Sequence, residues 1–211
     1  MQENERYVSP IYNERVDQEE FISVCMDILR NARNEIYLSM RFLDVALSSL
    51  YFAPDLSVRG VATDGSGLFF EPAVLARMYR KSRVLVNRTY LHAILHCLFC
   101  HMWNRKKRAE DYWNLACDIA VESIIDSLYR LCVHIPLSST RRDLYGRLEK
   151  KITVFNAESV YKALQEMGLS EEEYQRFAAE FYRDDHCKWG KDEKQPQPNQ
   201  VRNKKEDWDD K

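Results

Sequence analysis

The segment LHAILHCLFCHMW places three histidines and two cysteines close together. His92 and His96 have the i, i+4 spacing with which a helix turns two imidazoles toward one metal ion, as in zinc peptidases. Cys97, Cys100 and His101 have the C-x-x-C-H spacing of haem c attachment. His96, Cys97, Cys100 and His101 could also hold a structural zinc ion. The same thirteen letters therefore admit three different sites.

Position around a helix favours the first of these sites. At about 100° per residue, His92 and His96 lie together at the edge of an apolar arc, whereas His101 falls roughly opposite His92. Haem c attachment needs an export signal, and the N-terminal sequence MQENERYVSP has neither the basic region nor the apolar core of one. A Cys2His2 zinc site needs a second ligand pair, for which poor candidates remain (Cys132, His134, His186 and Cys187).

A third ligand to the His92 and His96 pair is expected from another element. No glycine follows His96, so the helix is predicted to continue, which makes His101 the less suitable third ligand. Asp118 falls within the buried arc of the next predicted helix, residues 111–131, where an acid needs a partner or a metal. The predicted zinc ligands are thus His92, His96 and Asp118, with His101 less suited. The alternatives are core histidines with satisfied hydrogen bonds and an aspartate paired with arginine.

The elements that carry these residues predict a mainly α, α+β domain with a small β hairpin. Only six glycines and six prolines, with 30% charged residues, favour helices over a sandwich or barrel. The segments SVRGVATD and GLFFEP flank a DGSG turn and predict the hairpin. A capping box at Asp17 predicts a helical stretch that runs to the break at Pro54. Further helices are predicted after Pro72, from Val84, and over residues 111–131 and 157–167. A second capping box at Ser170 predicts a helix over residues 171–183.

Domain boundaries and charge limit the function. We expect an N-terminal extension over residues 1–16, one domain over residues 17–189, and a disordered linker or tail over residues 190–211, which contain few apolar side chains. A net charge of -2 gives no reason to expect nucleic-acid or membrane binding. No export signal or long apolar run is present, so a cytoplasmic protein is expected.

Several stretches together resemble a known family: NARNEIYLSMRFLDVALSSL, ATDGSGLFFEP, VNRTYLHAILHCLFCH, YWNLACDIAVESIIDSL and FYRDDHCKW. They are similar to the N-terminal metallopeptidase-like domain of bacterial von Willebrand factor A-like (VWA-like) proteins, a predicted group of metal-dependent peptidases. The resemblance implies a reduced zincin-like arrangement with the hairpin beside the histidine helix. It also implies protein partners, namely a VWA-like domain and a MoxR-type AAA ATPase.

The family pattern H-E-x-x-H-x4-H places its histidines at His92, His96 and His101, and its aspartate at Asp118. Ala93 departs from the pattern, because the family has a glutamate there that acts as the general base on the metal-bound water.

We therefore expect a metal-binding, metallopeptidase-like domain with weak or no proteolysis that acts in protein interaction. One alternative is an active zinc hydrolase with a displaced acid, for which Glu122 and Glu71 are the candidates. Another alternative is a metal-free helical interaction module. If the cleft is open, Ala93→Glu is expected to raise activity.

Overall fold

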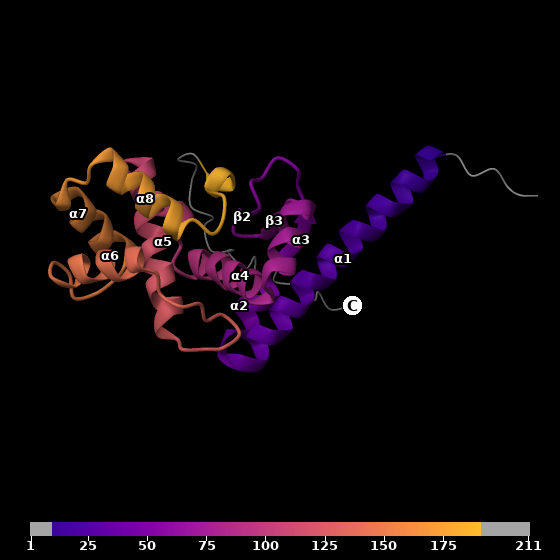
Figure 1. Ribbon diagram of the computed structural model, residues 1–211, viewed down its shortest axis with the longest axis horizontal. Coiled ribbons are helices and arrows are strands. Elements are labelled where there is room, and N and C mark those ends of the chain that lie inside the picture. The colour runs from indigo at the N-terminus through magenta and orange to yellow at the C-terminus, as the bar shows by residue number, and fades with distance from the viewer. Residues whose placement is uncertain (1–9, 191–211) are drawn as a thin grey trace, which may run out of the picture.

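The structure is a computed structural model that describes residues 10–190, with side chains described from residue 17 onward. Within that range it contains eight α-helices, three short 3-10 helices and one small sheet (Figure 1). The expectations for residues 1–9 and 191–211, including most of the predicted tail, lie outside the described residues. The α-helices are α1 (Pro10–Ser39), α2 (Asp44–Ser49), α3 (Pro72–Lys81), α4 (Arg83–Leu98), α5 (Glu110–Ser127), α6 (Ser139–Glu149), α7 (Ala157–Met167) and α8 (Glu171–Phe181). The 3-10 helices are η1 (Arg41–Leu43), η2 (His101–Trp103) and η3 (His186–Lys188). A mainly α fold with a small β component is confirmed.

The N-terminal helix differs from its prediction at both ends. Helix α1 begins at Pro10 rather than at Asp17, and proline fits the first turn of a helix because it lacks an amide hydrogen that would need a partner there. The helix ends at Ser39, and η1 and α2 follow. The expected helical stretch up to Pro54 therefore ends early, and its last residues form a strand instead.

The sheet has three strands in the order β1-β3-β2. Strands β2 (Val61–Thr63) and β3 (Gly67–Phe70) pair in antiparallel fashion and confirm the predicted hairpin. Strand β1 (Tyr51–Pro54), which was not predicted, runs parallel to β3. The hairpin turn packs on η2, because a Cβ atom at Gly65 would lie 2.5 Å from the ring of Trp103. This contact explains the glycine and fixes η2 against the sheet.

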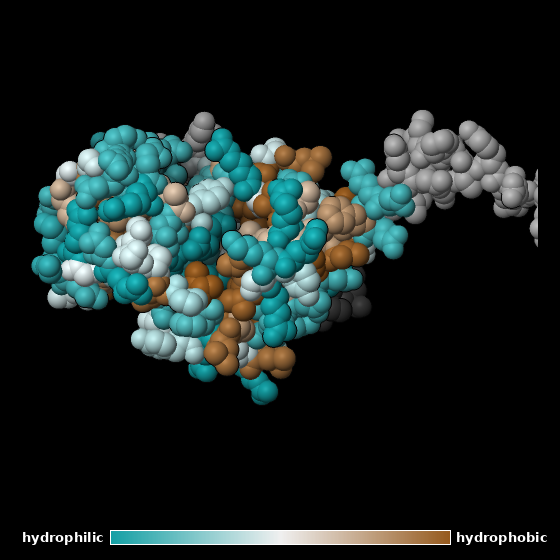
Figure 2. Space-filling view, viewed as in Figure 1, coloured by the Kyte–Doolittle hydropathy of each residue, from teal (hydrophilic) through white to brown (hydrophobic). Residues whose placement is uncertain are grey.

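Helix α5 separates two apolar clusters. The N-terminal cluster joins α1–α4 and the sheet, and it includes Val121 and Ile125 from one face of α5. The C-terminal cluster joins α6–α8 to the opposite face of α5, which contributes Trp113 and Ala120. Figure 2 shows apolar side chains gathered on the surface of the N-terminal half, whereas the half formed by α6–α8 is mainly hydrophilic. Among residues 10–190, no helix combines the length and apolar character needed to span a bilayer.

Candidate metal centre

Five side chains from three parts of the chain converge between the two apolar clusters. Helix α4 carries His92 and His96, and α5 carries Asp118. Asp184 and His186 come from the segment after α8, at the start of η3. One nitrogen or oxygen atom from each of the five residues lies within 4.8 Å of all the others. The structure thus brings the three predicted ligands together and adds two residues that had not been predicted as ligands of this site.

The sheet holds the last two residues in place. The backbone amide of Asp185 donates to the carbonyl of Val61 on β2 at 2.6 Å. The Asp185 carboxylate accepts from the amide of Arg59 at 2.9 Å and from the amide of Cys187 at 3.1 Å. Through Asp185, the DDH segment is thus bonded to Val61 on the edge strand β2 and to Arg59 just before it. Asp184 and His186, on either side of Asp185, are thereby positioned over α4 and α5.

The donor atoms are spaced as ligands of a single ion. Nε2 of His92 lies 2.7 Å from Nε2 of His96, and 3.4 Å from Oδ1 of Asp118. Nε2 of His186 lies 3.1 Å from Oδ1 of Asp118 and 3.2 Å from Oδ1 of Asp184. Zinc bonds to nitrogen and oxygen are about 2.1 Å long, so neighbouring ligands of one ion lie roughly 3 to 3.5 Å apart. The three distances that involve a carboxylate fall in this range, and the distance between His92 and His96 is shorter. The cluster fits a metal ion with nitrogen and oxygen ligands.

An unpaired oxygen supports the same conclusion. Oδ2 of Asp184 is buried and has no hydrogen-bond partner among the described residues. Asp184 itself is 1% exposed, so water does not readily supply the missing bond. A buried carboxylate oxygen without a partner is costly unless a cation lies beside it. The cluster therefore contains a buried acceptor oxygen to which no described protein group donates.

Without a metal ion, protons on two histidines balance the negative charge of the two aspartates. Burial lowers the pKa of His92, but hydrogen bonds to Asp118 and Asp184 outweigh it and raise that pKa well above its usual value. Burial also lowers the pKa of His186, and the same two carboxylates overcome it and raise that pKa to about 10. Burial, together with the nearby charge of His92, lowers the pKa of His96 to about 4. Two carboxylates are thus matched by two imidazolium ions, and one divalent cation carries the same charge.

A buried ionic network lies behind the histidines. Nδ1 of His92 is 3.0 Å from Oε1 of Glu122, a residue that is fully buried on α5. Glu122 in turn accepts hydrogen bonds from Arg88 on α4 and Arg141 on α6, and it forms an ion pair of 3.3 Å with Arg183. The three parts of the chain that carry the converging residues, together with α6, are therefore joined through one carboxylate. Opposing charges lower the pKa of Glu122 despite its burial, so it is ionised.

Helix α4 ends earlier than predicted, which places His101 in a different role. Cys100 adopts a left-handed conformation with φ of 57°, so the chain turns at the point where a glycine would be expected. Nδ1 of His101 then lies 2.9 Å from Nδ1 of His96, on the side of that ring away from the cluster. The predicted continuation of the helix is wrong. His101 contacts a ligand residue and is not among the five converging side chains.

A cleft of about 640 Å³ opens above the cluster. Asp118, Asp184 and His186 form part of its wall, whereas His92 and His96 are completely buried beneath it. The remaining wall is mainly polar and is formed by the start of α5, one side of α8 and the segment before β2. A molecule in the cleft would therefore meet the cluster from the side of its two aspartates.

Comparison with known proteins agrees with this geometry. Residues 27–210 match the protein family described as "Putative metallopeptidase domain". The chain belongs to this family. No curated protein and no solved structure matches it.

Position 93, where the resemblance implies a glutamate, lies outside the cleft wall. Ala93 is 0% exposed and belongs to the N-terminal apolar cluster. Its side chain does not form part of the cleft wall. A carboxylate at this position would be surrounded by apolar side chains, which changes the expectation for Ala93→Glu.

The two candidate displaced acids have other contacts. Glu122 faces Nδ1 of His92 and is absent from the cleft wall. Glu71 caps α3, where its two carboxylate oxygens accept from the amides of Ala73 and Val74 at 3.1 Å and 2.6 Å. The catalytic roles proposed for both residues stay predictions. Among the acids of the cleft wall, Asp118 and Asp184 belong to the cluster, whereas Glu110, Asp111 and Asp185 do not.

Sequence reasoning missed Asp184 and His186 as ligands of this centre. The sequence indicates His186 only as one of four poor candidates, with Cys132, His134 and Cys187, for the second ligand pair of a structural zinc site. The signal that could have found them is the run DDH, which lies in one of the stretches that resemble the family. Neither Cys97 nor Cys100 belongs to the cluster.

Proposed function

We propose that this metallopeptidase domain binds one zinc ion through His92, His96 and His186 together with Asp118 and Asp184. The observation that carries the proposal is the convergence of five donor atoms within 4.8 Å in a buried position. Imidazole suits zinc, and a mixed nitrogen and oxygen donor set is typical of catalytic zinc sites rather than of structural sites rich in cysteine. Trp189 supports the geometry, because its ring stacks on His186 with centroids 3.6 Å apart.

Elemental analysis of the purified, untagged chain tests the metal. We expect about one zinc per chain, which His92→Ala and His186→Ala remove. His134 is the matched control, because it is an exposed histidine outside the cluster, and His134→Ala should retain the metal. If the protein contains less than one metal ion per chain and none of these substitutions changes that content, the proposed ligands are ruled out.

We further propose that peptide cleavage by this domain is weak or absent. Bound zinc would polarise a carbonyl group and lower the pKa of a water molecule. Cleavage of an amide also requires a group that accepts a proton from the water and returns it to the leaving amine. The resemblance assigns this role to a glutamate at position 93, but this chain has alanine there, and position 93 lies outside the cleft wall. Loss of a general base commonly lowers the rate by about 10² to 10⁴. By its resemblance, the domain would then act through protein partners, such as a VWA-like domain and a MoxR-type AAA ATPase.

One observation favours a second candidate function, that of an active zinc hydrolase with a displaced acid. Oδ2 of Asp184 has no hydrogen-bond partner among the described residues, and Asp184 lies in the cleft wall. If Asp118 and the three histidines suffice to hold the ion, Asp184 is free to accept the proton.

Cleavage of a mixed peptide library by the zinc-loaded chain, with and without chelator, separates the two functions. Robust chelator-sensitive cleavage that Asp184→Asn abolishes, while zinc content is retained, would establish the second function. Cleavage at background level supports the first.

A further inference from the structure

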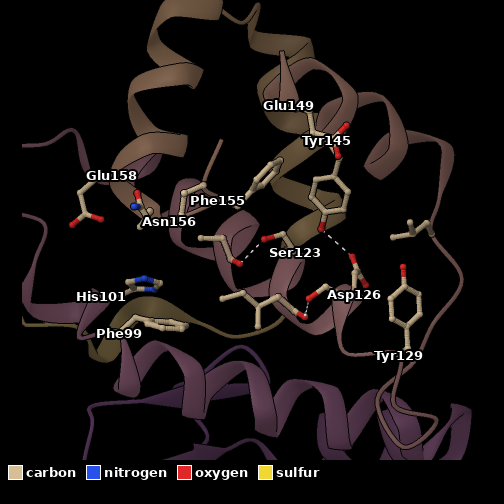
Figure 3. Close-up of a pocket in the computed structure, with 16 residues that line it drawn as sticks. Phe99, His101, Ser123, Asp126, Tyr129, Tyr145, Glu149, Phe155, Asn156 and Glu158 are labelled. Carbon is tan, nitrogen blue, oxygen red and sulfur yellow. Dashed lines mark hydrogen bonds between the residues drawn. The ribbon is translucent and has the colours of Figure 1, made fainter. Parts of the chain in front are cut away.

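A second cavity lies on the other side of α5 from the cleft. It has a volume of about 690 Å³, which is within the usual range for ligand sites. Figure 3 shows Phe99 and His101 on one side of it and Phe155 and Tyr145 on the other. Its floor is α5, where small residues such as Ala120 and Ser123 leave the space open. His101 is the partner of His96, so one wall of this cavity touches the metal centre.

The apolar surface continues beyond the cavity. Tyr129 and Val154 line it and are 81% and 60% exposed, and Phe99 is 45% exposed. Leu131, two residues beyond Tyr129, is 88% exposed. Large exposed apolar side chains that gather around a cavity mark a binding surface. Because this surface extends past the cavity mouth, it suits a chain that lies across it better than a compact molecule that fits inside.

The charge of the lining is of one sign. It contains three carboxylates, those of Asp126, Glu149 and Glu158, and no lysine or arginine. Asp126 is neutralised by ion pairs with Arg88 and Arg141. Glu149 and Glu158 are exposed and form no ion pair with a described residue, so they remain available to a basic partner. Figure 3 places both at the edge of the cavity.

We propose that this cavity is a docking site for a peptide segment with a large apolar anchor flanked by lysine or arginine. The anchor enters between Phe99 and Phe155, above Ser123. The flanking basic side chains reach Glu149 and Glu158, whose opposite charge excludes acidic sequences. The proposal does not depend on the metal centre, because none of its binding groups belongs to the five ligands.

Fluorescence anisotropy of the full chain with a labelled probe peptide tests the site. The probe has a Leu-Phe-Leu core with two arginines on each side. Two matched peptides carry glutamates in place of the arginines, or serines in place of the core. We expect saturable binding of the probe and at least tenfold weaker binding of both matched peptides. Equal binding of all three would overturn the proposal.

Substitutions in the lining locate the binding. Ser127 is exposed on the last turn of α5, and its hydroxyl bonds only to the carbonyl of Ile124 in its own helix. Ser127→Trp should fill the cavity and weaken binding of the probe about tenfold or more. If that variant does not fold, Val154→Asp places a charge at an exposed apolar position for the same purpose. Unchanged affinity in a folded variant of either kind would overturn the proposal.

Charge reversal separates this cavity from a general attraction to acidic surface. The double variant Glu149→Lys with Glu158→Lys should weaken binding about tenfold and reduce its dependence on salt. The control is Glu19→Lys with Glu172→Lys, two exposed acids on α1 and α8 that do not line the cavity. Equal loss in both double variants would overturn the proposal. So would tighter probe binding by Trp208→Ala, because the chain's own C-terminal segment would then be the occupant.

Discussion

The carboxylate of Glu122 lies 3.0 Å from Nδ1 of His92, on the edge of the imidazole opposite the nitrogen that faces the metal centre. A carboxylate in this place fixes the tautomer and the orientation of a ligating histidine and raises its basicity. Glu122 is therefore better suited to hold a ligand than to act on a substrate. Its charge is held in turn by Arg88 and Arg141, which are also buried.

The first prediction concerns this carboxylate. Glu122→Gln keeps the size of the side chain and removes its charge, so His92 loses its ionic partner. We expect the dissociation constant for zinc to rise about 10- to 100-fold, as for other groups that orient metal ligands. Competition with a chromophoric chelator measures it. Asp126→Asn is the matched control, because Asp126 shares both arginines but does not contact a histidine of the cluster. Equal weakening in the control would assign the effect to the arginines instead.

The second prediction concerns Arg88, which is fully buried and donates to Glu122, to Asp126 and to the carbonyl of Val133. Arg88→Met retains most of the volume but leaves two buried carboxylates short of a cation. Removing one member of a buried ion pair commonly costs 3–5 kcal/mol, because the remaining charge is uncompensated, and we expect a loss of about that size. Urea unfolding of the full chain gives the free energy.

Arg30 is the control for this substitution. It pairs with Asp27 on the exposed surface of α1, and the two side chains are 56% and 63% exposed. Such pairs contribute about 0–1 kcal/mol, so Arg30→Met should change the free energy of unfolding little. Similar losses in the two variants would mean that the buried network does not stabilise the fold as argued.

Periodicity and capping signals were sufficient to predict most helices but not the whole site. The i, i+4 pair and the buried position of Asp118 are properties of single helices, and both were visible in the sequence. The contacts of Asp184 and His186 are not, because they depend on how the segment after α8 pairs with β2. Cys100 also takes a left-handed conformation that its residue type rarely adopts, so the end of α4 was not signalled.

Short-range sequence signals also predicted some of the smaller elements. The DGSG turn predicted the β2–β3 hairpin, and the capping box at Ser170 predicted α8; both are confirmed. Strand β1 was read as helix, because its only support is parallel pairing with β3 across a separation that the sequence does not reveal. Contacts distant in sequence thus account for the differences in both the sheet and the site.

The third prediction concerns removal of the metal. A ligand that binds only the folded state stabilises it, by about 2.7 kcal/mol at a free concentration one hundred times its dissociation constant. Without metal, the carboxylates of Asp118 and Asp184 must be balanced by protonated His92 and His186 in the same buried space, and burying these charges is costly. We expect chelation to lower the melting temperature and added zinc to restore it. His134→Ala should respond like the unmodified chain, whereas His186→Ala should not respond to zinc. If chelator leaves the melting temperature of the zinc-loaded chain unchanged, the metal does not contribute to the stability of the fold.

The fourth prediction concerns position 93. Ala93 is completely buried in the apolar cluster, and the cleft wall does not include it. A glutamate there would be an unpaired charge among apolar side chains, so Ala93→Glu should lower the free energy of unfolding by about 3–5 kcal/mol. Ala93→Met, of similar length but uncharged, separates the cost of charge from the cost of overpacking, and it should be the more stable variant of the two.

Urea unfolding at pH 7 compares them, and the peptide library measures cleavage. We expect no gain in cleavage from Ala93→Glu, because a carboxylate at this position does not face the molecule in the cleft. A stable Ala93→Glu chain that gains chelator-sensitive cleavage would show that position 93 reaches the metal-bound water after all, and that its alanine is what limits proteolysis.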